Sequence, residues 1–105
     1  MNTPNLGDLQ HLTMVAVVRL GDNAYGGSIQ EELRQVAKRD LSVSSVYVTL
    51  VRLEDQGLLR SEKAERGSQS VGRPRRVFHV TDVGWEALRA ARHSLDRIWD
   101  GVEFA

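Results

Sequence analysis

Cysteine is absent from the 105-residue sequence, which removes disulfides, cysteine–zinc sites and thiol catalysis together. Net charge is absent as well, because 14 Lys and Arg are balanced by 14 Asp and Glu. No apolar run approaches the ~20 residues that span a bilayer, and the N-terminus has neither a basic start nor an apolar signal core. We therefore expect a cytoplasmic protein with a single hydrophobic core.

Recognisable catalytic and metal-ligand patterns are also lacking. The sequence shows no phosphate-binding glycine loop, no Ser-His-Asp set and no carboxylate pair, so no enzymatic activity is expected. The three histidines, His11, His79 and His93, are scattered over separate predicted elements. A lone histidine is more often packed or solvated than a ligand, so we expect neither a metal site nor a cofactor.

Residues 41–57, LSVSSVYVTLVRLEDQG, are the most informative stretch that is present, with Ser42 as the predicted helix cap and Gly57 as its stop. At about 100° per residue, one face is apolar and comprises Val43, Val46, Leu50 and Leu53. The other face comprises Ser44, Ser45, Val48 and Arg52. Solvated helix faces normally carry Lys, Glu and Gln, whereas hydroxyls, a methyl-bearing side chain and one Arg suit base edges in a DNA groove. Taken alone, the segment is equally compatible with a core helix whose outer face has no role.

A strand, a basic loop and a second strand are predicted after this helix. The strand-like runs are residues 58–60 and 77–80, and residues 67–76 between them read GSQSVGRPRR. Residues 60–76 hold six Arg or Lys and two Glu, a local charge of +4, whereas residues 82–105 hold five acids and three Arg. Helix, strand, basic loop and strand is the order of a winged helix-turn-helix, in which the helix enters a groove and the hairpin, or wing, holds phosphates. A basic stripe matters more for DNA than the whole-chain sum.

Two further helices are predicted before this segment. Residues 9–20 are apolar nearly all round, which is typical of a helix buried on two sides, against its own domain and against a partner subunit. Ser28 and Glu31 have capping-box spacing and predict the start of a second helix, which we expect to end at residues 38–39.

A long helix is predicted from Thr81-Asp82 onward. Apolar residues spaced three and four apart form the seam of a short coiled coil, namely Leu88, Ala91, Leu95, Ile98 and Val102. A helix of ~20 residues is about 30 Å long, more than a small domain needs, so we interpret it as a dimerisation helix. The alternative is that it folds back on its own domain. Trp99 beside the seam either packs at the interface or, with its symmetry mate, stacks a small planar aromatic effector.

With these elements placed, the chain resembles the PadR family of bacterial transcriptional regulators over residues 9–95. The matching segments are Ala24-Tyr25-Gly26 with Ile29 and Glu32-Leu33, LSVSSVY at 41–47, Leu50 with RLEDQGLL at 52–59, GRPRR at 72–76 with Phe78, and VTDVG at 80–84. The resemblance implies a homodimeric regulator, usually a repressor, with its third helix in the major groove and its wing on phosphates. The expected organisation is a flexible N-terminus (1–8), a winged helix-turn-helix DNA-binding domain (9–80) and a C-terminal dimerisation helix (81–105), without a separate effector domain.

The predicted DNA contacts are Ser42, Ser44, Ser45, Tyr47, Val48, Arg52, Arg73, Arg75 and Arg76, and the predicted dimer contacts are the five seam residues with Trp99. Arg52 suits a bidentate contact to guanine, with a phosphate contact or an ion pair to Asp55 as alternatives. For Tyr47 there are two alternatives: the hydroxyl contacts a phosphate while the ring packs, or the side chain has a packing role only. The three serines lie near the start of the helix, where the backbone N–H groups and the helix dipole favour a phosphate. The alternative function is a winged helix that docks a protein without binding DNA, for which a basic wing has no evident use.

Overall fold

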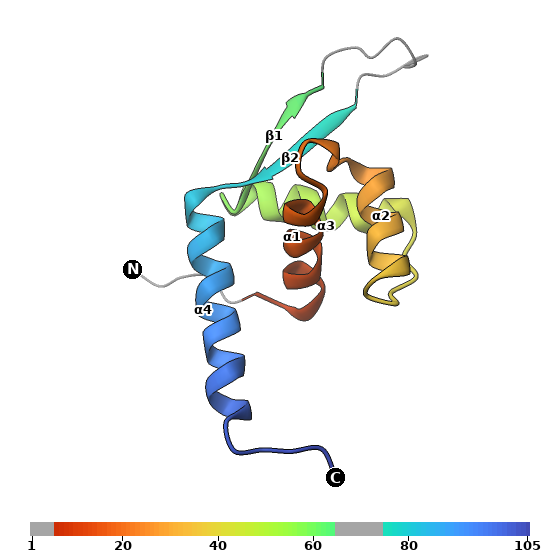
Figure 1. Cartoon of the computed structure of the whole chain (residues 1–105). Coiled ribbons are helices and arrows are strands. Elements are labelled where there is room, and N and C mark those ends of the chain that lie inside the picture. The colour runs from red at the N-terminus through yellow and green to blue at the C-terminus, as the bar shows by residue number, and fades with distance from the viewer. Residues whose placement is uncertain (1–5, 65–74) are drawn as a thin grey trace.

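The computed structural model describes residues 6–64 and 75–105 as four helices and an antiparallel two-stranded hairpin (Figure 1). The order is α1 (Asp8–Leu20), the 3₁₀ turn η1 (Gly21–Asn23), α2 (Gly26–Gln35), α3 (Val43–Asp55), β1 (Leu59–Lys63), β2 (Arg76–Val80) and α4 (Asp82–Trp99). The predicted fold, mainly α with a small β-hairpin and a long C-terminal helix, is confirmed. Residues 1–5 and 65–74 lie outside the described ranges, and with them Arg73 and most of the predicted wing tip.

Helix α1 lies at the centre of the fold and contacts the other three helices and β2. Its inner side is buried and consists of Thr13, Met14, Ala16 and Val17. Val15 and Val18 on another side are exposed, as the all-round apolar pattern predicts for a helix with a second surface to cover. The core is completed by large side chains from the other three helices and both strands, among them Ile29, Leu33, Leu50, Leu53, Leu59, Phe78 and Leu88.

Helix α2 begins earlier and ends earlier than its sequence pattern predicts. The prediction of Ser28 as the N-cap is wrong, because Tyr25 holds that position and Ser28 lies one turn inside the helix. The Ser28 hydroxyl still satisfies a helix-end donor, since it accepts a hydrogen bond from the Tyr25 backbone N–H at 3.0 Å. The helix ends at Gln35 instead of residues 38–39, and the chain reverses at Lys38, whose φ of 59° is unusual for a residue with a side chain.

Helix α3 has the predicted ends. The Ser42 hydroxyl accepts a hydrogen bond from the Ser45 backbone N–H at 3.1 Å, and Gly57 follows the helix with a φ of 77°. Val46, Leu50 and Leu53 are buried as expected, but Val43 in the first turn is 47% exposed. Val43 lies before the point at which α3 meets the core. The buried face of the helix therefore begins at Val46, and the predicted apolar face includes one residue too many.

The hairpin is joined to α3 and to α4 through one short junction. Leu59 pairs with Val80 and Lys63 with Arg76, and the preceding residues 57–58 receive two hydrogen bonds from Thr81. The Thr81 hydroxyl donates to the Gly57 carbonyl at 2.6 Å, and its backbone N–H donates to the Leu58 carbonyl at 3.1 Å. The same hydroxyl accepts from the Gly84 backbone N–H at 3.0 Å and so caps α4. The C-terminal end of α3, the base of the wing and the N-terminal end of α4 therefore meet at residues 57–58.

Helix α4 packs on the domain with its first turns and then projects away from it (Figure 1). Gly84, Ala87 and Leu88 are buried, whereas every residue after Ala91 is exposed. The helix ends at Trp99, and Gly101 has a φ of 80°, so Val102 does not continue the predicted helical seam. None of the helices in the described ranges combines the length and apolar character needed to cross a membrane.

Candidate nucleic-acid interface

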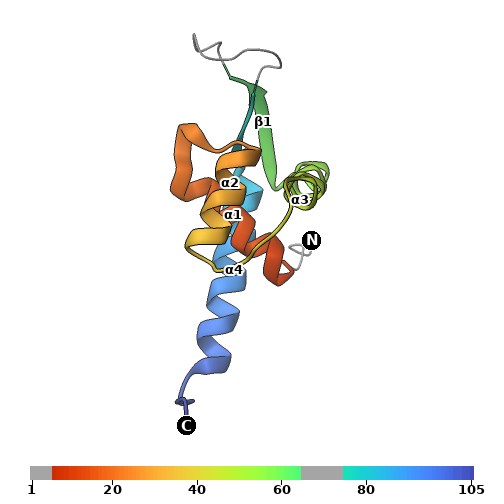
Figure 2. The same ribbon diagram turned by 90° about the vertical axis from the view of Figure 1, so that its right-hand side faces the viewer.

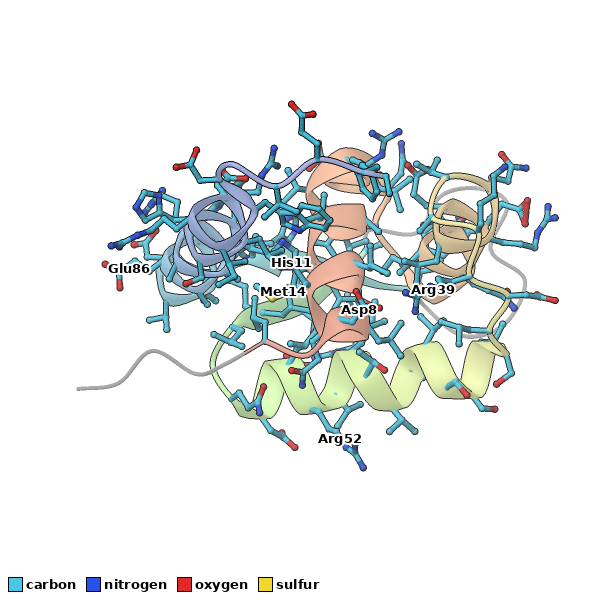
Figure 3. All side chains as sticks on the ribbon, turned by 90° about the horizontal axis from the view of Figure 1, so that it is seen from below. Asp8, His11, Met14, Arg39, Arg52 and Glu86 are labelled. Atoms are coloured by element: carbon cyan, nitrogen blue, oxygen red, sulfur yellow. The ribbon has the colours of Figure 1, made fainter. Side chains whose placement is uncertain are left out.

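The outer face of α3 carries the short polar and branched side chains that the sequence assigns to DNA. Ser44, Ser45, Val48 and Arg52, here called the reading face, are all exposed. Figure 3 shows Arg52 directed away from the rest of the molecule, on the side of α3 opposite to α1. Figure 2 shows α3 end-on at the edge of the molecule, with the foot of β1 beside it. Nothing in the described part of the chain covers this face.

Two residues at the centre of this surface were not assigned from the sequence. Val51 is 44% exposed, and Asp55 is exposed one turn further along. Helical spacing places both in line with Ser44 and Val48, since three- and four-residue steps return to one face. The signal was present in the periodicity, but Val51 resembles a core residue and Asp55 seemed to be only a partner for Arg52.

The serines at the start of α3 have different hydrogen-bonding states. Ser42 caps the helix and also donates from its hydroxyl to the Ser45 hydroxyl at 3.0 Å. Ser44 has no hydrogen bond to any other described residue through its side chain. The whole Ser44 hydroxyl is therefore available to an external partner, and Ser45 accepts from Ser42 but keeps its own O–H to donate, while Ser42 acts first as a cap.

The side chain of Tyr47, a residue of α3, packs against α2 and the wing. Its ring meets the Phe78 ring edge-on at a centroid distance of 6.4 Å, and the position of a Cβ on Gly26 would be only 3.4 Å from it. The side chain is nevertheless 42% exposed. The ring therefore packs inside the fold while part of the side chain stays exposed, which is compatible with a phosphate contact as well as with packing.

The Arg52 side chain forms no ion pair or hydrogen bond with any residue in the described ranges, including Asp55. Its guanidinium therefore presents five N–H donors in a plane, the geometry that matches a guanine edge or a phosphate.

At the root of the wing, the described arginines contact other elements. Arg76 donates from Nε to the Ser61 hydroxyl at 2.9 Å, and that hydroxyl donates to Oε2 of Glu54 at 2.7 Å. This chain of contacts joins β2 to β1 and to the last turn of α3. The Arg75 guanidinium lies over the Tyr25 ring, 4.3 Å from its centroid. Sequence reasoning missed both contacts, because each joins residues far apart in the chain.

Histidines and acids of the described residues form no cluster of three that could hold a metal ion. His79 is instead 3.1 Å from a carboxylate oxygen of Glu62 across the hairpin. On the outer face of α2, the hydrogen bond from Arg34 holds the pKa of Glu31 below its usual value, and the pKa of Arg34 is raised in turn. This ion pair joins two residues one turn apart on α2 and is not part of the reading face.

The predicted dimer residues divide between the domain and the projecting part of α4. Leu88 is buried in the chain's own core and Ala91 is half-buried, whereas Leu95 is 50% and Ile98 75% exposed. Trp99 packs against Phe104 at a ring-centroid distance of 5.1 Å and remains half-exposed.

An open groove of about 460 Å³ lies between α1 and α4 and is lined by His11, Val15, Val18, Trp85, Leu88, Arg89, Arg92, His93 and Asp96. A second groove on the other side of α4 includes Leu12, Ala91 and Leu95.

Comparisons with solved structures return proteins of this architecture. A PadR family transcriptional regulator from Eggerthella lenta DSM 2243 is 31% identical, with a TM-score of 0.68 over 90% of this chain and 82% of its own. A PadR-like transcription factor from Bacteroides fragilis is 23% identical, with a TM-score of 0.71 over 90% of this chain and 85% of its own. F93 from STIV, a winged-helix DNA-binding protein, has a TM-score of 0.70 at 18% identity over 90% of this chain and 95% of its own. A comparison with curated proteins gives no significant match.

The sequence itself also matches a family model, that of the transcriptional regulator PadR-like family, over residues 14–90. The matched range runs from α1 through the wing into the first half of α4, and so includes the reading face, the junction at residues 57–58 and the root of the wing. On this match and on the relative with 31% identity, the chain belongs to the PadR-like family of transcriptional regulators.

Proposed function

We propose that the protein is a homodimeric repressor that binds a pseudo-palindromic DNA site, with one α3 in the major groove of each half-site. The observation that carries this proposal is the exposed reading face of α3 beside the root of a basic wing. Short hydroxyl and methyl-bearing side chains permit close approach to base edges, and Arg52 supplies a bidentate donor. Arg73, Arg75 and Arg76 are assigned to phosphates, where they add affinity without sequence preference.

Support for the dimer comes from apolar surface that a single chain leaves exposed. Leu95, Ile98 and Trp99 lie on the projecting part of α4, and Val15 and Val18 line the groove between α1 and α4. Monomers rarely leave so much apolar surface uncovered, so we assign these surfaces of α1 and α4 to contacts with a second copy of the chain. The two-fold symmetry of such a dimer would match two half-sites about one helical turn apart, roughly 34–36 Å.

Selection of duplexes from a random DNA pool tests the proposal directly. Enrichment of a pseudo-palindromic site supports it, and its insertion upstream of a reporter gene should lower expression when the protein is present. In binding assays, Arg52→Ala should relax specificity at one base position in each half-site, a loss of about 1–3 kcal/mol per contact. Replacing Arg73, Arg75 and Arg76 by Ala should weaken binding to all sequences and flatten the log–log salt dependence by roughly one unit per lost phosphate contact.

Two results would contradict parts of this proposal. If no duplex is enriched and the protein binds no random DNA at low salt, the alternative of a protein-docking winged helix takes precedence. If the three wing substitutions weaken only the selected site, the arginines read bases instead of phosphates.

We also propose that a small planar aromatic effector, if the regulator has one, binds between the Trp99 side chains of the two subunits. The support is the half-exposed indole at the end of α4, which packs in a tilted arrangement against one aromatic neighbour, Phe104. Such a ligand would act as an inducer only by binding the DNA-incompetent arrangement more tightly than the competent one.

A further inference from the structure

The root of the wing contacts the beginning of α2 through one aromatic ring. Tyr25 is the N-cap residue of α2, and its ring is half-buried. The guanidinium of the exposed Arg75, immediately before β2, lies 4.3 Å from the ring centroid. This distance is well within the roughly 6 Å over which a cation is attracted to the face of an aromatic ring.

The backbone around this contact is fixed by hydrogen bonds on both sides. The Phe78 backbone N–H donates to the Ala24 carbonyl at 2.8 Å, which holds β2 alongside the residue that precedes Tyr25. The Ala64 backbone N–H donates to the Arg75 carbonyl at 2.7 Å, which extends the β1–β2 pairing to Arg75. The stacked pair is therefore supported by the main chain and is not a contact between two free side chains.

The neighbouring arginine, Arg76, is held by contacts on the α3 side of the wing. Arg76 binds Ser61, which in turn binds Glu54 at the end of α3. Adjacent residues of a strand point to opposite faces, so Arg75 and Arg76 are restrained on the two faces of β2, one by α2 and the other by α3. Both cations at the root of the wing are thus placed relative to the helix-turn-helix before any DNA binds.

We propose that Tyr25 is a positioning residue of the DNA interface, which holds the Arg75 guanidinium by its ring face so that its N–H edge meets a phosphate. A guanidinium held over the face of a ring keeps the N–H donors that point away from the ring available to a phosphate. An unstacked arginine would lose its rotamer freedom on binding, whereas a stacked one has lost much of it beforehand. The inference rests on the proposed DNA binding by this surface and adds a residue of α2 to it.

Five proteins separate a positioning role from a general structural one: wild type, Tyr25→Leu, Tyr25→Phe, Arg75→Gln and the double variant Tyr25→Leu/Arg75→Gln. Each is titrated with a fluorescein-labelled duplex of random sequence at several salt concentrations, because phosphate contacts do not depend on sequence. Tyr25→Leu should weaken binding about two- to five-fold, the range of an exposed cation–π contact. Arg75→Gln should weaken it further and lower the salt slope by about one.

The decisive observation is the double variant. If Tyr25 acts through Arg75, adding Tyr25→Leu to Arg75→Gln should produce little further loss, and Tyr25→Phe, which keeps the ring, should retain wild-type affinity. If Tyr25→Leu lowers affinity by the same factor with and without Arg75, the tyrosine only supports the fold and the proposal is overturned. If wild type binds neither the random duplex nor a selected site, the proposed function fails first, and the positioning role fails with it.

A spectroscopic measurement covers the case in which Tyr25→Leu does not fold. The Nε–H proton of Arg75 in wild type should show an upfield ring-current shift in its NMR signal, abolished by Arg75→Gln and retained in the complex with the random duplex. A random-coil chemical shift in the free protein, or loss of the upfield shift on DNA binding, would contradict a preformed and maintained stack.

Discussion

Replacement of Gly84 by alanine should destabilise the protein, although glycine is normally a poor helix residue. Gly84 is buried in the first turn of α4, where an added Cβ would lie 2.2 Å from the Leu58 carbonyl oxygen and 2.8 Å from Cγ1 of Val80. A carbon and a carbonyl oxygen normally approach no closer than about 3.3 Å. The clash involves backbone, so α4 itself must move away by about 1 Å to make room.

The magnitude follows from three contributions. Overpacking costs about 1–3 kcal/mol, and a backbone clash belongs to the upper part of that range. Displacement of α4 also weakens the hydrogen bond from the Thr81 N–H to the same Leu58 carbonyl, which contributes about 1 kcal/mol. Better helix propensity offsets about 1 kcal/mol. The net loss is about 2–3 kcal/mol, or roughly 10–20 °C in melting temperature for a domain of this size.

Thermal unfolding followed by circular dichroism, at one fixed protein concentration, measures this loss. Gly27→Ala in α2 is the matched control, because Gly27 is exposed and a Cβ there would meet only the Tyr25 ring at ordinary distances of 3.5 and 3.8 Å. That substitution should leave stability unchanged or raise it by up to about 1 kcal/mol. Equal melting temperatures for the two variants would refute the close approach of α4 to Leu58.

Three other outcomes are expected. Ser42→Ala should lower stability by about 1 kcal/mol in a denaturant titration, since the Ser45 N–H loses its cap, whereas Ser44→Ala should change it little; equal losses would contradict the capping geometry. Placing Asp at both Leu95 and Ile98 should give monomers in sedimentation, because buried unpaired carboxylates cost several kcal/mol; an unchanged dimer would mean that these residues lie outside the interface. Planar aromatic compounds that bind the proposed effector site should quench tryptophan fluorescence in wild type and Trp85→Leu but not in Trp99→Leu, and the reverse pattern would place the site elsewhere.

Local signals in the sequence predicted the element order and several boundaries. Ser42 and Gly57 bracket α3, and Thr81 starts α4, because caps and positive-φ glycines depend on residues within one turn. The start of α2 was misplaced because the Ser28 hydroxyl performs cap chemistry from inside the helix, and a serine three residues before a glutamate looks the same in either role. Its early end at Gln35 was not visible, since the chain then reverses at Lys38 without a glycine.

Contacts between distant segments were beyond sequence reasoning. The stacking of Arg75 on Tyr25 and the Glu54–Ser61–Arg76 chain depend on how β2 is placed against α2 and α3, and no local pattern encodes that placement. The seam of α4 was extended to Val102 on spacing alone, although Gly101 carries the signal for a helix end. Exposure also required the fold, since periodicity places Val43 and Leu50 on one apolar face, yet Leu50 is buried and Val43 is 47% exposed.

The attachment of α4 by its first turns alone bears on which operators the proposed dimer would accept. An 18-residue helix is about 27 Å long, so a tilt of about 10° at its root displaces the far end by about 5 Å. One base pair of spacer adds about 3.4 Å between half-sites. A change of about 7° at the root of α4 therefore matches the translation of about 3.4 Å, but not the rotation of about 34°, that one base pair adds between the half-sites. In the proposed dimer, the stiffness of that root would contribute to the tolerance for spacer length.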